Sequence, residues 1–101
     1  MSKLSITEVK AAMPNLPEWK RRQQVLHREY KFADFVTAMK FVNTVAKAAE
    51  AANHHPDIDI RWNKVRLTLT THDAGGLTKK DFTLAERCDV LGKKGAATAA
   101  R

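Results

Sequence analysis

The chain has 101 residues, a length that supports one small domain with a limited core. Its 44% hydrophobic and 29% charged residues are typical of a folded globular protein and exclude a disordered chain. No apolar run approaches the roughly 20 residues of a membrane-spanning helix, and the N-terminus lacks the apolar segment of a secretion signal. A single cysteine, Cys88, excludes an internal disulfide, so we expect a cytoplasmic protein.

The net charge of +7 raises the question of nucleic-acid binding. Residues 93–101 contribute three positive charges and no acidic residue, which leaves +4 for residues 1–92. No zinc-finger spacing or aromatic-basic strand signature accompanies these charges, so a nucleic-acid partner is not expected. We expect residues 1–92 to form the single domain and residues 93–101 to be a disordered, basic and alanine-rich tail.

The N-terminal third of the chain predicts one helix and two strands. A capping-box pattern at residues 5–8 begins a short helix that ends near Met13, where prolines follow. We expect two strands within residues 18–32, with Trp19 opening the first and the turn at residues 20–24.

The second of these strands has apolar residues at every other position. Leu26, Tyr30 and Phe32 are therefore predicted to face the core. Arg28 shares this face, and we expect it at the edge with its charge in solvent. His27 is predicted on the opposite, solvent-facing side.

Residues 34–52 predict the longest helix, with Asp34 at its positive N-terminal end. The apolar residues of this helix form two adjacent stripes, and one sheet can cover only one of them. The breadth favours contact with the same helix of another subunit, although alanine could also serve only to raise helix propensity. The stripes are Phe35, Met39, Val42, Ala46 and Ala49, and Ala38, Phe41, Val45, Ala48 and Ala52.

After this helix the sequence predicts a hairpin and a last helix. Two strands with period-two alternation are joined by a turn at residues 62–64, and His72 follows the second strand. A second capping-box pattern at residues 78–81 begins a helix that ends near Gly92. The order α-β-β-α-β-β-α predicts a two-layer α+β domain, with a four-stranded antiparallel sheet and the helices on one face.

Three histidines gather around the end of the long helix, where His54 and His55 precede Pro56 and His72 follows one hairpin later. A metal site could use them with Asp57, but adjacent histidines normally point apart and no His-x₃-His pair is present. A structural corner, in which His55 caps the last carbonyls of the helix, explains one histidine but not three. Proton transfer is the third interpretation, because imidazole titrates near neutral pH and the negative helix end favours its protonated form.

The sequence offers no activated nucleophile to these histidines. The Ser5 hydroxyl is predicted to cap a helix, and Cys88 lies on the inward face of another. The histidines therefore indicate acid–base chemistry on a bound small molecule without covalent catalysis.

The spacing of the residues around these histidines resembles the signature of the pterin-4a-carbinolamine dehydratases. The resemblance extends from the region of Trp19 through the last helix, and it includes residues 32–35 and 70–73. The matching signature residues are Glu50, His54, His55, Pro56, Trp62, His72 and Asp81.

The resemblance implies a two-layer α+β fold that assembles as a homotetramer through the long helix 34–52. It also implies a hydro-lyase activity, the removal of water from 4a-hydroxytetrahydropterin to give quinonoid dihydropterin. This reaction recycles the tetrahydrobiopterin-type cofactor of aromatic amino-acid hydroxylases, so a functional link to such a hydroxylase is expected. Neither a metal nor an organic cofactor is implied.

The resemblance further implies a set of site residues. His54 and His72 are expected in acid–base roles, and His55 in substrate binding and proton transfer. The candidates for substrate binding are Trp19, Glu50, Pro56 and Asp81.

Some of these residues also have structural interpretations. Trp19 could be a packing residue, and Glu50 could orient a histidine four residues later or face solvent. For Asp81 the capping position is a complete explanation, which we favour. The chain departs from the family at Asn53, where some members carry an acid, and at residues 20–24, which lack a common glycine.

Two other functions remain open for a chain of this family. Some mammalian relatives serve as dimerisation cofactors that bind a partner helix of a homeodomain transcription factor. A role in the maintenance of molybdopterin enzymes is also compatible with the resemblance. No feature of this sequence demands the partner-helix role, and the sequence does not separate the molybdopterin role from pterin recycling.

Overall fold

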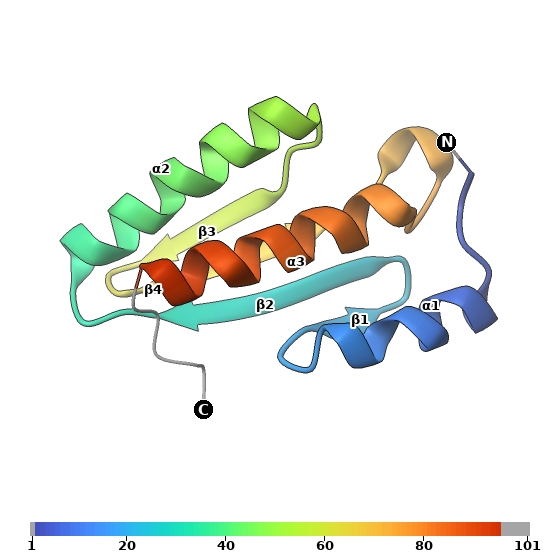
Figure 1. The fold of residues 1–101 in the computed structure, drawn as a ribbon, viewed down its shortest axis with the longest axis horizontal. Helices are drawn as coiled ribbons and strands as arrows, with labels where there is room; N and C mark the ends of the chain where they lie inside the picture. The colour runs from blue at the N-terminus through green and yellow to red at the C-terminus, as the bar shows by residue number, and fades with distance from the viewer. Residues whose placement is uncertain (1, 96–101) are drawn as a thin grey trace.

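The computed structural model describes residues 2–95 and confirms an α+β fold with the order α-β-β-α-β-β-α (Figure 1). Two short 3₁₀ helices, η1 and η2, are added to the expected elements. The elements are α1 (Ile6–Ala12), η1 (Met13–Asn15), β1 (Lys20–Arg22), β2 (Val25–Lys31), α2 (Phe35–Ala52), β3 (Asp57–Arg61), β4 (Lys64–Leu69), η2 (His72–Ala74) and α3 (Lys79–Lys94).

The four strands form one antiparallel sheet in the order β1-β2-β4-β3. The central pair aligns Tyr30 with Val65 and Leu26 with Leu69, so the apolar residues of both strands lie on one face. Figure 1 shows α2 and α3 lying across this face. The core between the layers contains Leu26, Tyr30, Phe41, Val45, Val65, Leu67, Leu69, Leu84 and Ala85.

Strand β1 lies within residues 20–24, for which the sequence predicted a turn. β1 occupies Lys20–Arg22, and the turn is confined to Gln23 and Gln24, with Gln23 at φ 53°. The three residues of β1 are all basic, so they show no apolar alternation that could indicate a strand. They form one because their backbone pairs with the edge of β2, where charged side chains can stay in solvent.

Arg28 also differs from its prediction, because it is not a solvent-facing edge residue. Its side chain is 9% exposed, forms an ion pair of 2.7 Å with Asp89 and lies over the Tyr30 ring. A carboxylate from α3 reaches this position, and a buried guanidinium requires such a partner. Phe32 is buried as predicted, although it lies just beyond the end of β2.

Helix α2 covers the sheet with one side and leaves its other side open. Its N-cap is Asp34, whose side chain accepts a hydrogen bond from the backbone N–H of Thr37. Phe35 and Val36 are 48% and 61% exposed at its first turn. The residues buried against the sheet and α3 are Ala38, Phe41, Val45 and Ala49.

Helix α3 begins as predicted and ends later than predicted. The capping box of Thr78 and Asp81 is present, and the helix continues through Lys94, two residues past the expected end near Gly92. Residues 96–101 of the expected tail lie outside the described residues. Within residues 2–95, no helix is long and apolar enough to cross a membrane.

Candidate active site

The C-terminal end of α2 is built to present two histidines. Asn53 adopts the left-handed conformation at φ 49°, which asparagine tolerates better than most residues. Its N–H donates to Glu50 O, and the N–H of His54 donates to Ala49 O, the paired bonds of a Schellman motif. The helix therefore stops at Asn53, and the chain reverses so that the next two side chains point to different partners.

His54 points inward and joins the end of α2 to the start of α3. Its residue exposure is 8%, and Nε2 lies 2.6 Å from Oδ1 of Asp81. Asp81 is fully buried, so this carboxylate is removed from solvent and held against the imidazole. A buried pair of this kind fixes the ring in one orientation.

The capping position does not completely explain Asp81, contrary to the interpretation that the sequence favoured. Oδ2 accepts the Thr78 N–H at 2.9 Å, which is the capping contact, and the Thr71 hydroxyl at 2.8 Å. Oδ1 is turned to His54. The two oxygens of Asp81 thus serve different elements, since one caps α3 and the other holds the histidine.

His55 lies on the surface, where its Nε2 is 2.5 Å from Oε2 of Glu50. The sequence predicted that Glu50 could orient His54, four residues later, but Glu50 contacts His55, five residues later. The left-handed residue Asn53 breaks the helical spacing, which sends His54 inward and leaves His55 beside Glu50. The side chains of His55 and Glu50 are 57% and 79% exposed, so solvent screens this pair.

His72 is the first residue of η2 and is exposed. It directly follows Thr71, whose hydroxyl bonds to Asp81, so His72 leaves the sheet at the end where α3 begins. Figure 1 shows the end of α2, the η2 turn and the start of α3 at the same end of the molecule. Among the described residues, no hydrogen bond joins the His72 ring to either of the other two histidines. Pro56 is partly buried just after the histidine pair.

The structure does not bring Trp19 to the histidines. Its ring is 3% exposed and packs edge-on against Tyr30, and Nε1 donates to Asp89 at 2.9 Å. Asp89 lies two turns of α3 beyond Asp81. Trp62, another signature residue, lies in the β3–β4 turn and is 67% exposed.

Sequence reasoning overlooked two residues that organise these contacts, Thr71 and Asp89. Thr71 continues the inward-facing series of Val65, Leu67 and Leu69, and a polar residue in such a series is a signal for a buried hydrogen bond. Asp89 has no comparable signal, because nothing in the sequence shows which residues of β2 lie opposite it.

The two candidate nucleophiles that the sequence raised, Ser5 and Cys88, are committed elsewhere. The Ser5 hydroxyl caps α1, and Cys88 is buried in the core. Burial, with the nearby charge of Asp89, raises the pKa of the Cys88 thiol to about 12, so it stays protonated near neutral pH. Within residues 2–95, no three His, Cys, Asp or Glu side chains are grouped to hold a metal ion.

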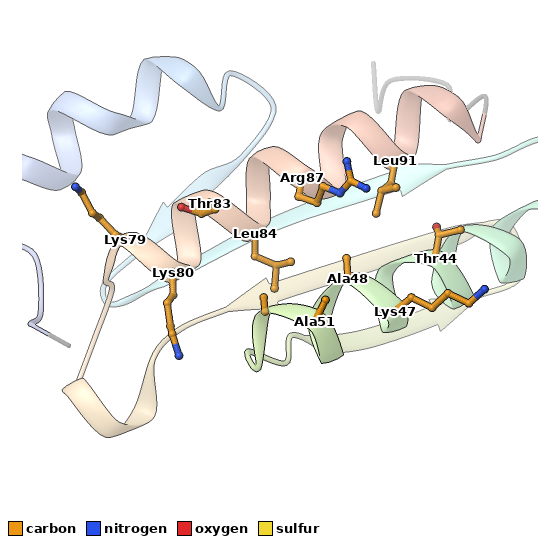
Figure 2. Close-up of a pocket in the computed structure, with 11 residues that line it drawn as sticks. Thr44, Lys47, Ala48, Ala51, Lys79, Lys80, Thr83, Leu84, Arg87 and Leu91 are labelled. Carbon is orange, nitrogen blue, oxygen red and sulfur yellow. The ribbon is translucent and has the colours of Figure 1, made fainter.

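A groove of about 780 Å³ runs between α2 and α3. In Figure 2, the small or apolar side chains of Ala48, Ala51, Leu84 and Leu91 face one another along it. None of the residues that line the groove is a histidine. The groove therefore brings no imidazole to a bound molecule. Its charged lining residues are Lys47, Lys79, Lys80 and Arg87.

Comparisons with known proteins show the family of the chain. The family model of pterin 4 alpha carbinolamine dehydratase matches residues 2–91. Proteins of Acidobacterium capsulatum and Picosynechococcus sp., provisionally named pterin-4-alpha-carbinolamine dehydratase, are 52% and 50% identical to the chain. The matches cover 90% and 89% of this chain and 99% and 98% of those proteins.

Two solved structures are similar to this one. A transcriptional coactivator/pterin dehydratase from Brucella melitensis has a TM-score of 0.87 at 31% identity, over 90% of this chain and 99% of that one. A pterin dehydratase-like RuBisCO assembly factor of the alpha-carboxysome has a TM-score of 0.61 at 21% identity, over 73% and 86% of the two chains, and shows likeness of fold alone. By its sequence matches and its fold, the chain belongs to the pterin-4a-carbinolamine dehydratase family.

Proposed function

We propose that this protein catalyses the dehydration of 4a-hydroxytetrahydropterin to quinonoid dihydropterin and water, in the recycling of a tetrahydrobiopterin-type cofactor. One observation carries the proposal beyond family membership. Two adjacent imidazoles, His54 and His55, leave the end of α2 with a carboxylate on each, one pair buried and the other exposed. Such groups can donate and accept protons at neutral pH while holding fixed orientations.

The reaction needs one acid and one base, and no covalent intermediate. Hydroxide is a poor leaving group, so an imidazolium first protonates the 4a-hydroxyl and the C4a–O bond breaks with release of water. The proton on N5 then passes to a neutral base, which gives the quinonoid product. One proton is given and one is taken, so a pair of histidines ends the turnover with its charge states exchanged.

We assign the acid–base roles to His54 and His72, and substrate binding with proton transfer to His55. The Asp81 contact supports the assignment of His54, because a held ring loses little orientational freedom during the reaction. Glu50 supports His55 in the same way but with weaker restraint, since that pair is exposed to solvent. Pro56 shapes the turn that carries both histidines.

We further propose that the protein works as a homotetramer assembled through α2. The open side of this helix and the groove beside α3 supply the surface for the contact. The expected partners are the pterin substrate and, functionally, an aromatic amino-acid hydroxylase.

The decisive experiment is a dehydratase assay that follows the loss of the 4a-carbinolamine absorbance with purified protein. The double variant His54→Ala/His72→Ala should lose the acceleration, because it lacks both proposed acid–base groups. His27→Ala is the matched control, since His27 lies on the open face of the sheet and should retain activity. Full activity in the double variant, or none in the parent protein, would overturn the proposal.

A further inference from the structure

A short chain of hydroxyl groups lies behind the carboxylate that holds His54. Oγ1 of Thr71 donates to Oδ2 of Asp81 at 2.8 Å and lies 2.9 Å from Oγ1 of Thr78. The Thr78 N–H donates to the same Oδ2 at 2.9 Å. Thr78 and Asp81 are fully buried and Thr71 is 9% exposed, so water does not compete freely for these contacts.

The direction of these hydrogen bonds follows from the number of protons available. A hydroxyl has one proton, and that of Thr71 is committed to Asp81. The Thr78 hydroxyl must therefore donate to Thr71, while it accepts the Lys80 N–H at 3.2 Å. Two donors thus occupy Oδ2, and Oδ1 is left to face His54.

The contact with Oδ1 of Asp81 determines which nitrogen of neutral His54 carries the proton. Oδ1 lies 2.6 Å from Nε2, and an ionised carboxylate can only accept, so Nε2 is the donor. The lone pair of neutral His54 is then on Nδ1. Nδ1 has no hydrogen-bond partner among the described residues. Within those residues, the buried side-chain nitrogen or oxygen atom that lacks a partner is Arg28 Nε, so Nδ1 of His54 is not a fully buried atom and solvent reaches it.

We propose that Thr71 is a positioning residue for His54. Together with the Thr78 N–H it occupies Oδ2 of Asp81, turns Oδ1 to Nε2, and makes Nδ1 the nitrogen that exchanges a proton with the substrate. The exchange of a proton with the substrate rests on the proposed function. The tautomer of His54 does not, and it can be measured without any enzyme activity.

The first test reads the tautomer of His54 by ¹⁵N NMR of the full chain labelled at histidine. The expected result is a protonated Nε2 and an unprotonated Nδ1 in the neutral ring. In Asp81→Asn, Thr71 and Thr78 should hold the amide oxygen at the place of Oδ2 and turn its NH₂ to Nε2. The proton should then move to Nδ1, an inversion of the kind that an Asp→Asn change causes in the serine-protease triad. A proton on Nδ1 in the parent protein, or an unchanged tautomer in the variant, would overturn the inference.

The second test separates positioning from folding. Thr71→Val keeps the shape of the side chain and removes its hydroxyl, whereas Thr71→Ser keeps the hydroxyl. We expect Thr71→Val to lower kcat about tenfold with KM nearly unchanged, because a misaligned imidazole loses part of its catalytic effect. Thr71→Ser should restore kcat.

The matched control is Thr70→Val, which removes a hydroxyl that donates to Gln24 O at 2.6 Å, away from Asp81. It should leave kcat unchanged. Equal losses in Thr71→Val and Thr71→Ser, or a parental kcat in Thr71→Val, would refute the positioning role. If the chain had no dehydratase activity, the proposed function would fall while the tautomer measurement would still decide the geometry.

Discussion

The indole N–H of Trp19 donates a hydrogen bond of 2.9 Å to Asp89, which lies 70 residues later in the chain. The same oxygen, Oδ1, accepts from Arg28 at 2.7 Å and from the Tyr30 hydroxyl at 2.5 Å. Burial and the Asp89 contact raise the pKa of Tyr30 far above its usual range, so the phenol remains a donor. Three donors thus tie α3 to the loop before β1 and to β2.

Trp19→Phe should destabilise the protein by about 2 kcal/mol, because it removes a hydrogen bond to a charged group and leaves space in the core. Since the ring is 3% exposed and committed to Tyr30 and Asp89, we expect KM for the pterin to change little. Urea unfolding and steady-state kinetics measure the two effects. Unchanged stability together with a large rise in KM would instead support the substrate-binding role predicted for Trp19.

Glu50→Gln should lower kcat by a smaller factor than loss of an imidazole, for which roughly 100-fold or more is expected. Glu50 touches the His55 ring from the surface, so solvent can replace part of its effect. The control is Glu86→Gln, which changes an exposed glutamate on a different helix, α3, and should have the kcat of the parent protein. A Glu50→Gln variant as inactive as the double histidine variant would mean that Glu50 itself transfers a proton.

Ala46→Glu should break the proposed tetramer. Ala46 belongs to a predicted apolar stripe of α2 and is exposed in the single chain, so the change leaves the core untouched. Buried at a contact between subunits, the new carboxylate would lack a partner. Sedimentation velocity should show four copies for the parent and for Lys40→Glu on the polar face of the same helix. A parent protein that sediments as a monomer contradicts the prediction.

His27→Gln should reduce the loss of stability on mild acidification. Partial burial, followed by the charges of Arg66, Lys20 and Arg22, lowers the pKa of His27 below the unfolded value of 6.5. As the pH falls below about 6.5, the unfolded chain takes up this proton before the folded one does, so folding weakens. The difference between urea midpoints at pH 7 and pH 5 should therefore be smaller in the variant. An equal or larger difference would show that His27 is not a source of this pH dependence.

The sequence determined the elements whose signals are local. The capping residues of α1 and α3 were predicted because a side chain there bonds to a backbone N–H three residues away or nearer. Asp34 was placed at the start of α2 by its favourable charge at the positive helix end. The alternation of apolar residues in β4 is also a local signal. It predicted the buried face of the strand, since a strand places every second residue on one side. β1 was misplaced because its pairing comes from the neighbouring strand and not from its own residues.

The candidate site shows the same division. Residue types and spacing predicted His54, His55 and His72 as the candidate acid–base groups, because few side chains titrate near neutral pH. The tertiary structure decided which carboxylate each of the first two contacts, because the left-handed turn at Asn53 and the packing of α3 set those directions. Contacts between elements 27 or 70 residues apart depend on packing geometry, which no short-range pattern records.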